Sequence, residues 1–404
     1  MNSINHKNKL IFIAFLLIVA PFSLSALDWG LMTDHNVSQE GVGSDPDKIH
    51  YQAYVVPWLS SIVADNGDLY ISAALNAMLE GGGWTVVPEL YQTDFAWNFD
   101  NGELRFGRTR YSDPLGLIFS GFFDGVSLAF DTQSGTFSAG AWYTGLLYKK
   151  TANITVTEDD FTSYYENFSY NKFFNTYFAS RRLAFALGWE HPGLMELIRL
   201  NVSVLGQVDL NGRDTQLHSQ YLAVKAGMPL GDYLVLDLGG ALSFAEISDK
   251  FQTGLAGELG LSVFLPGALS DRLRFTGIFS SGKSGGISPF IPVTTAAQGD
   301  ILKAKISGLS LLCLDYTARI HKTFSFSVAS TYFVLSDLGT YQGWPGEKEG
   351  HFLGNEFYGK LIWSPFSDLQ LNLGGGVFLP VMVNADPDAG IKWKIELNAV
   401  LAIF

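Results

Sequence analysis

The feature that most constrains this chain is the recurrence of apolar residues at every second position. In residues 234–245, leucine and phenylalanine occupy one face of the alternation and mostly small or polar residues occupy the other. The same pattern recurs in residues 183–190, 255–263 and 369–377. A period of two predicts β-strands with one apolar and one polar face. After residue 26 no apolar run reaches the length of about 18 residues that a membrane-spanning helix needs, so such helices are excluded.

Two architectures are built from strands of this kind. In a soluble sandwich the apolar face points into a core, whereas in an outer-membrane barrel it meets lipid and the polar face lines a lumen. The polar faces here are rich in glycine, alanine and serine, and charged residues make up only 16% of the chain, well below the usual proportion of about a quarter. Most candidate strands span about 10–17 residues, longer than ordinary globular strands. Both observations favour the barrel.

The alternation predicts an all-β, antiparallel barrel of about 18 strands, with a range of 16–18. The candidate strands are residues 27–34, 49–64, 68–80, 83–99, 103–110, 124–130, 136–148, 174–190, 196–210, 217–228, 233–246, 252–265, 272–281, 302–319, 322–336, 352–364, 369–380 and 390–404. No linker or repeat divides them, so residues 27–404 are predicted to form one domain.

The joins between these strands alternate in length. Short joins carry turn-forming sequences such as Asp65-Asn66-Gly67. The long joins are residues 35–48, 111–123, 149–173, 282–301, 337–351 and 381–389. The clearest exceptions are 81–82 and 247–251, which are short where a long join is expected. Outer-membrane barrels alternate short periplasmic turns with longer external loops, so this alternation supports a barrel with both termini on the periplasmic side.

The N-terminus predicts export. Residues 1–26 combine a short basic segment, an apolar stretch of about 13 residues and a small-residue end, which is the layout of a cleaved signal peptide. The alternative is an uncleaved membrane anchor, which the short apolar stretch disfavours. The only cysteine of the chain is Cys313, so a bacterial lipoprotein, a disulfide framework and a metal site built from cysteines are excluded.

The C-terminus ends in an amphipathic strand. Residues 391–404 place isoleucine, tryptophan and leucine on one face and lysine, glutamate and asparagine on the other, and the chain ends on Phe404. An ending of this kind resembles the signal by which outer-membrane barrels are recognised during assembly. Phe404 lies out of phase with the apolar face, and a slip or a bulge near the end would restore the phase.

Two stretches of the sequence resemble the alginate-export-like porins and related substrate-specific outer-membrane channels. Residues 103–111, ELRFGRTRY, resemble a strand that brings a Gly-Arg pair toward the pore. Residues 354–380 resemble the penultimate hairpin of that group, with a proline-containing turn and a glycine-rich return strand. The resemblance covers under a tenth of the chain. It implies a barrel of about 16–18 strands through which a small or polymeric, often anionic, solute diffuses.

Residue parity predicts which charged side chains line the lumen. The pore-lining candidates that parity gives are Glu103, Arg105, Arg182, Arg272, Arg274, Lys303, Lys305 and Arg319, and Arg108 is a further candidate that a bulge at Gly107 would turn inward. Most are basic although the net charge of the chain is −13, so we expect the acidic residues to concentrate in loops. A basic stripe inside an acidic envelope favours anions. The alternative is that these charges lie near the lipid head groups and only anchor the barrel.

The join at residues 111–123 is the candidate constriction loop, because it is unusually apolar for an external loop. The candidate constriction residues are Asp113, Pro114, Phe119 and Phe122. A lipid-facing or packing loop is the alternative. Arg108 shares parity with the apolar positions of its strand, so it either lies above the membrane or is turned inward by a bulge at Gly107.

Enzymatic chemistry has no support in the sequence. No two histidines have the spacing of a helical metal pair, and neither a nucleophile elbow nor a phosphate-binding loop is present. His218 and Ser219 are adjacent in a predicted strand and therefore point to opposite faces. We predict no catalytic residue, no metal site and no cofactor. The acidity of the chain also argues against nucleic acid as a partner.

The sequence therefore predicts a porin-like channel in the outer membrane of a diderm bacterium, for passive diffusion of small hydrophilic, anionic solutes. Its expected partners are outer-membrane lipid, the barrel-assembly machinery and small polar solutes. A plugged barrel that serves as an adhesin or recognition scaffold and a secreted soluble all-β binding protein are the alternatives. The solute and the oligomeric state do not follow from the sequence.

Overall fold

The computed structural model describes residues 24–80, 83–212, 216–247, 250–267, 269–283, 287–338, 350–380 and 390–403. The predicted signal peptide, residues 1–26, lies outside these residues except for its last three, which begin the first strand.

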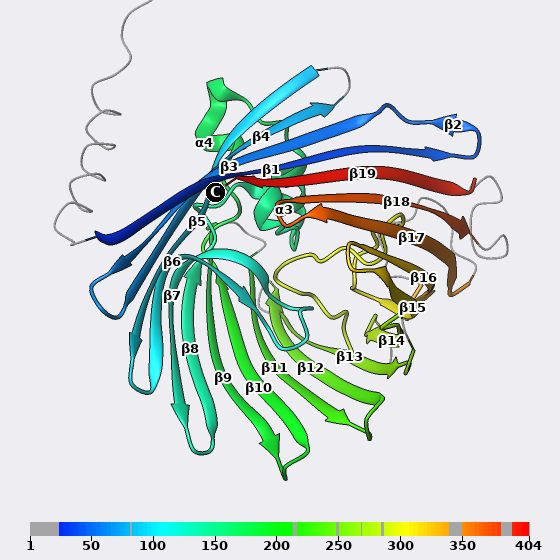
Figure 1. Ribbon diagram of the computed structural model, residues 1–404. Coiled ribbons are helices and arrows are strands. Elements are labelled where there is room, and N and C mark those ends of the chain that lie inside the picture. The colour runs from blue at the N-terminus through cyan, green and yellow to red at the C-terminus, as the bar shows by residue number, and fades with distance from the viewer. Residues whose placement is uncertain are drawn as a thin grey trace, which may run out of the picture.

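One antiparallel sheet closes on itself to form a barrel (Figure 1). β1 pairs with β3 on one side and with β19 on the other, which completes the ring. The short piece β2 (Asp45–Pro46) only flanks β1. The remaining 18 strands confirm the predicted barrel. Their bounds are β1 Leu24–Val42, β3 His50–Val63, β4 Gly67–Glu80, β5 Gly83–Phe99, β6 Gly102–Ser112, β7 Ser120–Thr132, β8 Gly135–Tyr143, β9 Arg182–Leu194, β10 Ile198–Asp209, β11 Leu217–Pro229, β12 Leu234–Ile247, β13 Lys250–Phe264, β14 Arg272–Ser280, β15 Leu309–His321, β16 Phe324–Leu335, β17 Phe352–Phe366, β18 Leu369–Pro380 and β19 Lys392–Ile403.

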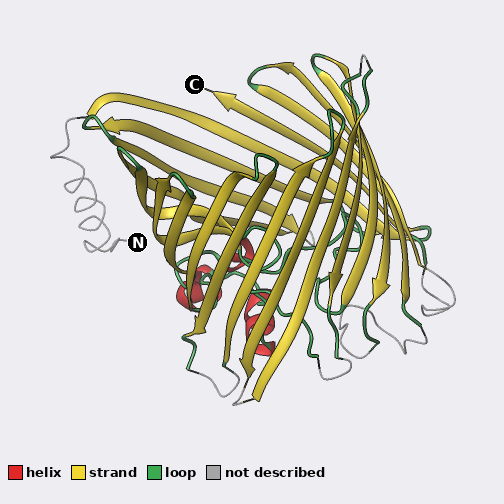
Figure 2. Ribbon diagram, turned by 90° about the horizontal axis from the view of Figure 1, so that it is seen from below, coloured by secondary structure: helices red, strands yellow, loops and turns green. Residues whose placement is uncertain are grey.

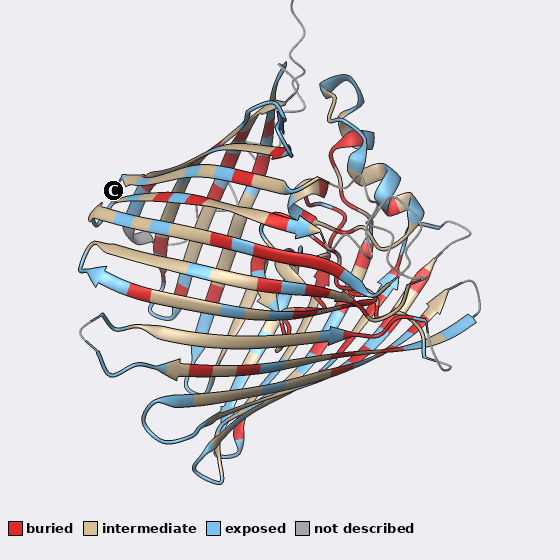
Figure 3. Ribbon diagram, turned by 90° about the vertical axis from the view of Figure 1, so that its right-hand side faces the viewer, coloured by how far each residue is buried: buried red, intermediate tan, exposed pale blue. Residues whose placement is uncertain are grey.

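The apolar face of each strand points away from the barrel interior. In β12, Leu238 and Phe244 are 47% and 48% exposed, whereas Ala241 and Ser243 on the alternate face are 5% and 2% exposed. The alternation of exposed and buried residues is visible along the strands in Figure 3. Small inward-facing residues leave room inside the barrel, and large apolar residues cover its outside, as in a barrel that is surrounded by lipid.

The joins differ in length between the two ends of the barrel. At one end, called here the short-turn end, β3 and β4 are separated by residues 64–66 and β17 and β18 by residues 367–368. At the opposite, long-loop end, β8 and β9 are separated by residues 144–181 and β14 and β15 by residues 281–308. The predicted alternation of short and long joins is therefore present in the structure.

Several predicted strand bounds are wrong. β1 continues to Val42, so the long loop predicted at residues 35–48 shrinks to residues 43–49. The prediction ended at residue 34 because residues 35–40 are mostly polar, but ladders with β3 and β19 hold this part of the strand. β9 begins at Arg182 and β15 at Leu309, later than the predicted starts at 174 and 302, because the preceding apolar residues belong to loops inside the barrel.

Short helices interrupt residues 144–181 and gather on one side of the barrel (Figure 2). They are α2 (Lys149–Ala152), α3 (Glu158–Tyr165), the 3₁₀ turn η1 (Tyr170–Lys172) and α4 (Phe173–Thr176). α3 begins after Thr157, whose side chain accepts a hydrogen bond from the Asp160 backbone N–H while the Asp160 side chain accepts one from Thr157, a capping box. Within the described ranges no helix is long and apolar enough to cross a membrane.

Candidate functional site

Three segments from the long-loop end fold against the inner face of the barrel: residues 113–119, residues 144–181, and residues 281–283 with 287–308. Glycines on the barrel wall make room for them. A Cβ added at Gly239 of β12 would collide with the Leu115 side chain of the first loop, and one at Gly254 of β13 would lie 2.8 Å from the Phe290 Cα of the third. The three segments therefore occupy part of the lumen, and are called here the inner loops.

Hydrogen bonds join the three inner loops to one another. The Val293 backbone N–H donates to the Ile118 carbonyl at 2.8 Å, and the Ser120 backbone N–H, directly after the first loop, donates to the Thr294 hydroxyl at 3.0 Å. The Thr295 N–H donates to the Asn153 carbonyl at 2.9 Å, which adds the middle loop to the other two. Because each loop is held by another, the three form a single structural unit.

An apolar cluster fills the space beneath this unit. Ile118 and Phe290 from the loops are fully buried, as are Phe123 and Trp142, whose side chains reach inward from β7 and β8. The Phe119 and Phe123 rings stack with centroids 3.9 Å apart. Burial of these rings stabilises the inward position of the loops by removing apolar surface from the aqueous lumen.

A buried carboxylate holds the first inner loop. The Asp113 side chain accepts hydrogen bonds from the backbone N–H groups of Leu115 at 3.0 Å, Ile118 at 2.9 Å and Phe119 at 3.0 Å. These donors have no strand partner, and the charged acceptor satisfies them inside the barrel. Asp113 was predicted as a constriction residue, and the structure places it at the base of the loop, only 4% exposed.

A second carboxylate holds the third inner loop in the same way. Glu356 of β17 is 2% exposed and accepts from the N–H groups of Asp300 at 2.7 Å, Ile301 at 3.1 Å and Leu302 at 2.9 Å. Gly299, with φ +83°, precedes this turn, and a Cβ there would lie 2.9 Å from a Glu356 carboxylate oxygen. The close approach of loop and carboxylate therefore requires glycine at this position.

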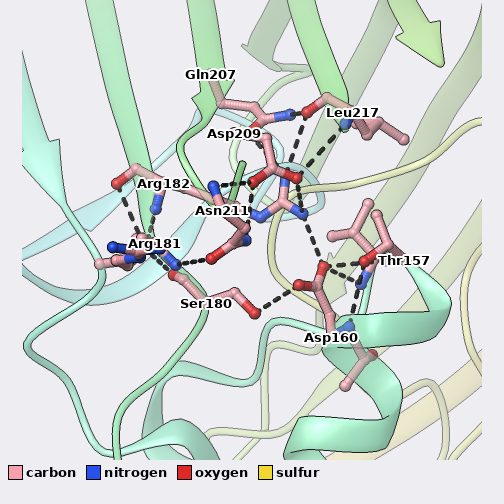
Figure 4. Close-up of polar contacts among 12 residues, drawn as sticks. Thr157, Asp160, Ser180, Arg181, Arg182, Gln207, Asp209, Asn211 and Leu217 are labelled. Carbon is pink, nitrogen blue, oxygen red and sulfur yellow. Dashed lines mark hydrogen bonds and ion pairs between the residues drawn. The ribbon is translucent and has the colours of Figure 1, made fainter. Parts of the chain in front are cut away.

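The middle inner loop is held by a buried arginine (Figure 4). Arg182, at the start of β9, is fully buried, and its Nη2 lies 2.7 Å from Asp160 of α3 and 3.2 Å from Asp209 of β10. Its Nη1 donates to the Gln207 amide oxygen at 2.8 Å. Burial alone would raise the pKa of Asp160, but Arg182 and hydrogen bonds from Ser180 and Thr157 outweigh it and bring the pKa below its usual value.

Charged side chains form a connected row on the wall of β11 to β14. Glu258 lies 3.3 Å from the Lys225 ammonium and 3.7 Å from the Arg274 guanidinium. Arg274 also lies 4.0 Å from Asp237. Gly260 lies next to Arg274, because a Cβ at this glycine would be 3.5 Å from Arg274 Nη2. Of the predicted pore-lining residues this row contains Arg274, and the carboxylates beside it balance much of the positive charge of the row.

Arg199 of β10 was not among the predicted lumen residues. It is exposed, and within the described ranges no carboxylate lies within ion-pair distance of it. It lines a recess of about 240 Å³ together with Glu190, Lys225, Asp237 and Pro114 of the first inner loop. Its position in strand 196–210 had the correct parity, so the alternation rule could have identified it.

The opposite wall is more acidic. Arg105 of β6 lies 3.0 Å from Asp94 and is paired with Glu103 on its own strand. Together with Asp28 and Asp68 these residues line a recess of about 250 Å³ near the short-turn end. The structure therefore places Glu103 and Arg105 together on the inner face, with carboxylates in excess around the guanidinium.

The remaining predicted residues lie in different surroundings. Lys303 and Lys305 lie in the third inner loop, not in a strand as predicted, and Lys303 pairs with Glu40 of β1 at 2.6 Å. Arg272 lies 3.9 Å from Asp315. Arg319 donates to the Lys322 carbonyl at the short-turn end at 2.8 Å.

Arg108 and Phe122 lie where β6 separates from β5. Arg108 is 4% exposed, with its Nη2 2.7 Å from Asp124 of β7. Gly107 before it has φ +118°, and a Cβ at this glycine would collide with the Thr93 carbonyl of β5. The Phe122 ring lies 5.5 Å from the Tyr91 ring of β5. A local distortion at Gly107 was one of the two arrangements expected for this strand.

No family model and no curated protein matches the sequence. Solved structures do match the fold. Pseudomonas aeruginosa OccK2 (OpdF), in complex with glucuronate, aligns with a TM-score of 0.64 at 13% identity over 95% of this chain and 99% of that one. The outer membrane protein opdK of the same organism aligns with a TM-score of 0.59 at 10% identity over 94% and 99%. OccD3 (OpdP), also from that organism, gives 0.58 at 11% identity over 94% and 92%.

These similarities show that the chain has the fold of this group of Pseudomonas proteins. The predicted resemblance to substrate-specific outer-membrane channels fits them in this respect. The narrower resemblance to alginate-export-like porins stays a prediction. At these identities the match concerns the fold, and the function has to be argued from the residues of this chain.

Proposed function

We propose that the protein is an outer-membrane channel through which small hydrophilic solutes diffuse. The observation that carries this proposal is the inverted distribution of residues, with leucine and phenylalanine outside the barrel and charged side chains along its inner wall. An apolar belt of this kind is stable in lipid, and a charged inner wall is compatible with a water-filled lumen. Inner loops that occupy part of the lumen beside a charged wall would favour selection among solutes.

The proposed solutes are anions of the size of a small carboxylate. On the wall of β10 to β14, Arg199 adds a positive charge beside Lys225 and Arg274 that has no ion-pair partner among the residues that the structure describes. A free guanidinium offers a planar pair of donors to a carboxylate. One structure with the same fold was solved in complex with glucuronate, which is such an anion. We propose Arg199 as the lumen residue with the largest effect on ion preference.

A plugged barrel is the second candidate function. The hydrogen bonds among the inner loops and the apolar cluster beneath them favour it, because a closed unit across the lumen would leave no conducting path. In that case the barrel would serve as a scaffold for recognition at the cell surface. Electrical conductance separates the two candidates.

Single-channel recording of the mature chain in a planar lipid bilayer under a salt gradient tests both. We expect discrete conductance steps and a reversal potential on the anion side, and Arg199→Ala should shift that potential toward cations. Lys322→Ala, at an exposed turn of the short-turn end, is the control and should leave it unchanged. Cation preference in the unmodified protein would overturn the anion proposal. Correct insertion without steps would favour the plugged barrel, and folding in water without detergent would refute the membrane placement.

A further inference from the structure

The wall of the barrel separates between β5 and β6. Their ladder runs from Phe99–Gly102 to Thr93–Arg108 and ends there, although β5 continues to Gly83 and β6 to Ser112. Along Gly83–Gln92, β5 has no strand partner on its β6 side among the described residues. An uncovered strand edge presents free backbone N–H and C=O groups, which are strongly unfavourable in hydrocarbon.

The exposed edge of β5 is covered by groups other than a strand. The Arg108 guanidinium donates to the Leu90 carbonyl at the point where the strands part. Pro88 follows along the same edge and has no N–H to satisfy. Farther toward the long-loop end, the Tyr170 hydroxyl donates to the Val86 carbonyl. The middle inner loop therefore covers the place where the neighbouring strand is missing.

One side of residues 168–178 of that loop packs against the inner face of β4 and β5. Val87 of β5 is fully buried against Tyr148 and Tyr177, and Phe173 and Phe178 complete this aromatic cluster. In Figure 1, α4 accordingly lies beside β4, whereas α3 lies toward the middle of the ring. The segment is thus fixed against the wall beside the uncovered edge of β5.

The segment also carries two exposed aromatic rings. Phe174 is 80% exposed and Tyr170 is 62% exposed. The Tyr170 hydroxyl reaches the Val86 carbonyl on the uncovered edge of β5, and on the outward face of this strand Trp84 and Val86 are 63% and 40% exposed. Lys172 lies between the two rings in sequence and is exposed as well. Aromatic rings next to a lysine are typical of a surface at the boundary between hydrocarbon and head groups.

We infer that residues 170–174 form a lipid-facing part of the barrel wall and contact acyl chains of the outer leaflet. This inference rests on the proposed membrane placement. It assigns to one edge of the middle loop a role different from narrowing the lumen: the segment completes the apolar belt where β5 and β6 separate. Tyr170 contacts the edge of a strand whose outward face carries the exposed Trp84 and Val86 of the apolar belt, which is why lipid, and not a soluble partner, is the expected occupant.

Spin-label accessibility tests the inference. Cys313→Ser removes the native thiol, and Phe174→Cys then carries a nitroxide in the full-length mature protein reconstituted in phosphatidylcholine vesicles. Molecular oxygen concentrates in the bilayer, whereas a neutral nickel chelate stays in water. Leu187→Cys, on the outward face of β9 and 63% exposed, is the matched wall control. Met195→Cys, 84% exposed between β9 and β10, is the water control.

The label at 174 should resemble the label at 187, with an oxygen-to-nickel accessibility ratio several-fold above that at 195. A label at 174 that behaves like the one at 195, while 187 reports lipid, would overturn the inference and leave the channel proposal intact. Nickel-accessible labels at both 174 and 187 would refute the membrane placement itself. Tyr170→Cys provides a second reading, and a water-like ratio there would also contradict the inference.

Discussion

The two kinds of charged residue inside this barrel differ in how they are surrounded. On the wall of β11 to β14, Lys225 and Arg274 keep 29% and 32% of their side-chain surface exposed, and their carboxylate partners lie at 3.3–4.0 Å. At the base of the middle inner loop, Arg182 is fully buried and lies 2.7 Å from Asp160. The wall charges remain accessible to water and solute, whereas the charges at the base of the loop are buried and pair only with one another.

This difference separates residues that select solutes from residues that shape the lumen. Partly exposed ion pairs contribute about 0–1 kcal/mol to stability, so evolution of the wall charges is constrained little by folding. Removal of one partner from a buried pair costs about 3–5 kcal/mol because a charge is left unpaired without water. We therefore expect substitutions at the loop bases to change the structure, and substitutions on the wall to change selectivity.

The largest effect is expected for Arg182→Ala. Loss of the guanidinium leaves Asp160 and Asp209 buried without a cation, so residues 144–181 should detach from the wall of β9 and β10. The free energy of loop docking should fall by about 3 kcal/mol or more, measured by the rate of protease cleavage within the loop in an otherwise intact barrel. Arg181→Ala is the control, because the Arg181 side chain is next in sequence and is exposed.

A smaller effect is expected for Glu356→Ala. Three backbone N–H groups of residues 300–302 lose their acceptor, which costs about 1–3 kcal/mol when water does not replace it. The third inner loop should then fluctuate, and the open-channel current should become noisier and larger. Glu356→Gln keeps one acceptor oxygen and should give an intermediate current. A current identical to that of the unmodified channel would show that this loop does not limit conductance.

The sequence predicted the barrel well and the inner loops poorly, for a physical reason. Strand β12 can be predicted from its own alternation, because the face on which each side chain lies depends only on its position within the strand. Asp160 and Arg182 meet through the path of a folded loop, and neither has a local pattern that identifies the other. Glu356 lies among glycine, asparagine and phenylalanine in a strand, and the three N–H groups that need it are more than 50 residues away.

The same reasoning limits the predicted site. Arg105 and Arg274 were identified because parity places a side chain inside or outside. Burial is a separate property, and for Arg108 and Arg182 it depends on the inner loops. Lys303 and Lys305 were assigned to a strand because residues 302–319 are rich in apolar side chains, but part of that apolar surface packs inside the barrel, next to Glu356 and Phe333.

Acid should loosen the middle inner loop over a defined pH range. The folded-state pKa of Asp160 lies below its usual value near 3.8. A depressed pKa contributes stability that is fully present above the unfolded value and is lost as the pH falls through the folded one. Protease protection of residues 144–181 should therefore stay constant from pH 7 to about 4 and decline below it. In Asp160→Asn the decline should be weaker, and an unchanged decline would assign it to other carboxylates.

The smallest effect on stability and a clear effect on selectivity are expected for Arg274→Ala. Its side chain is 32% exposed and its partners are 3.7 Å and 4.0 Å away, so screening by water and salt leaves about 0–1 kcal/mol to lose. Removal of the cation also leaves Asp237 and Glu258 with less compensation, so the reversal potential should move toward cations. Asp237→Asn should move it the other way. Both shifts should shrink at high salt, because screening acts on exposed charges, whereas a change that persists in molar salt would indicate an altered pore shape.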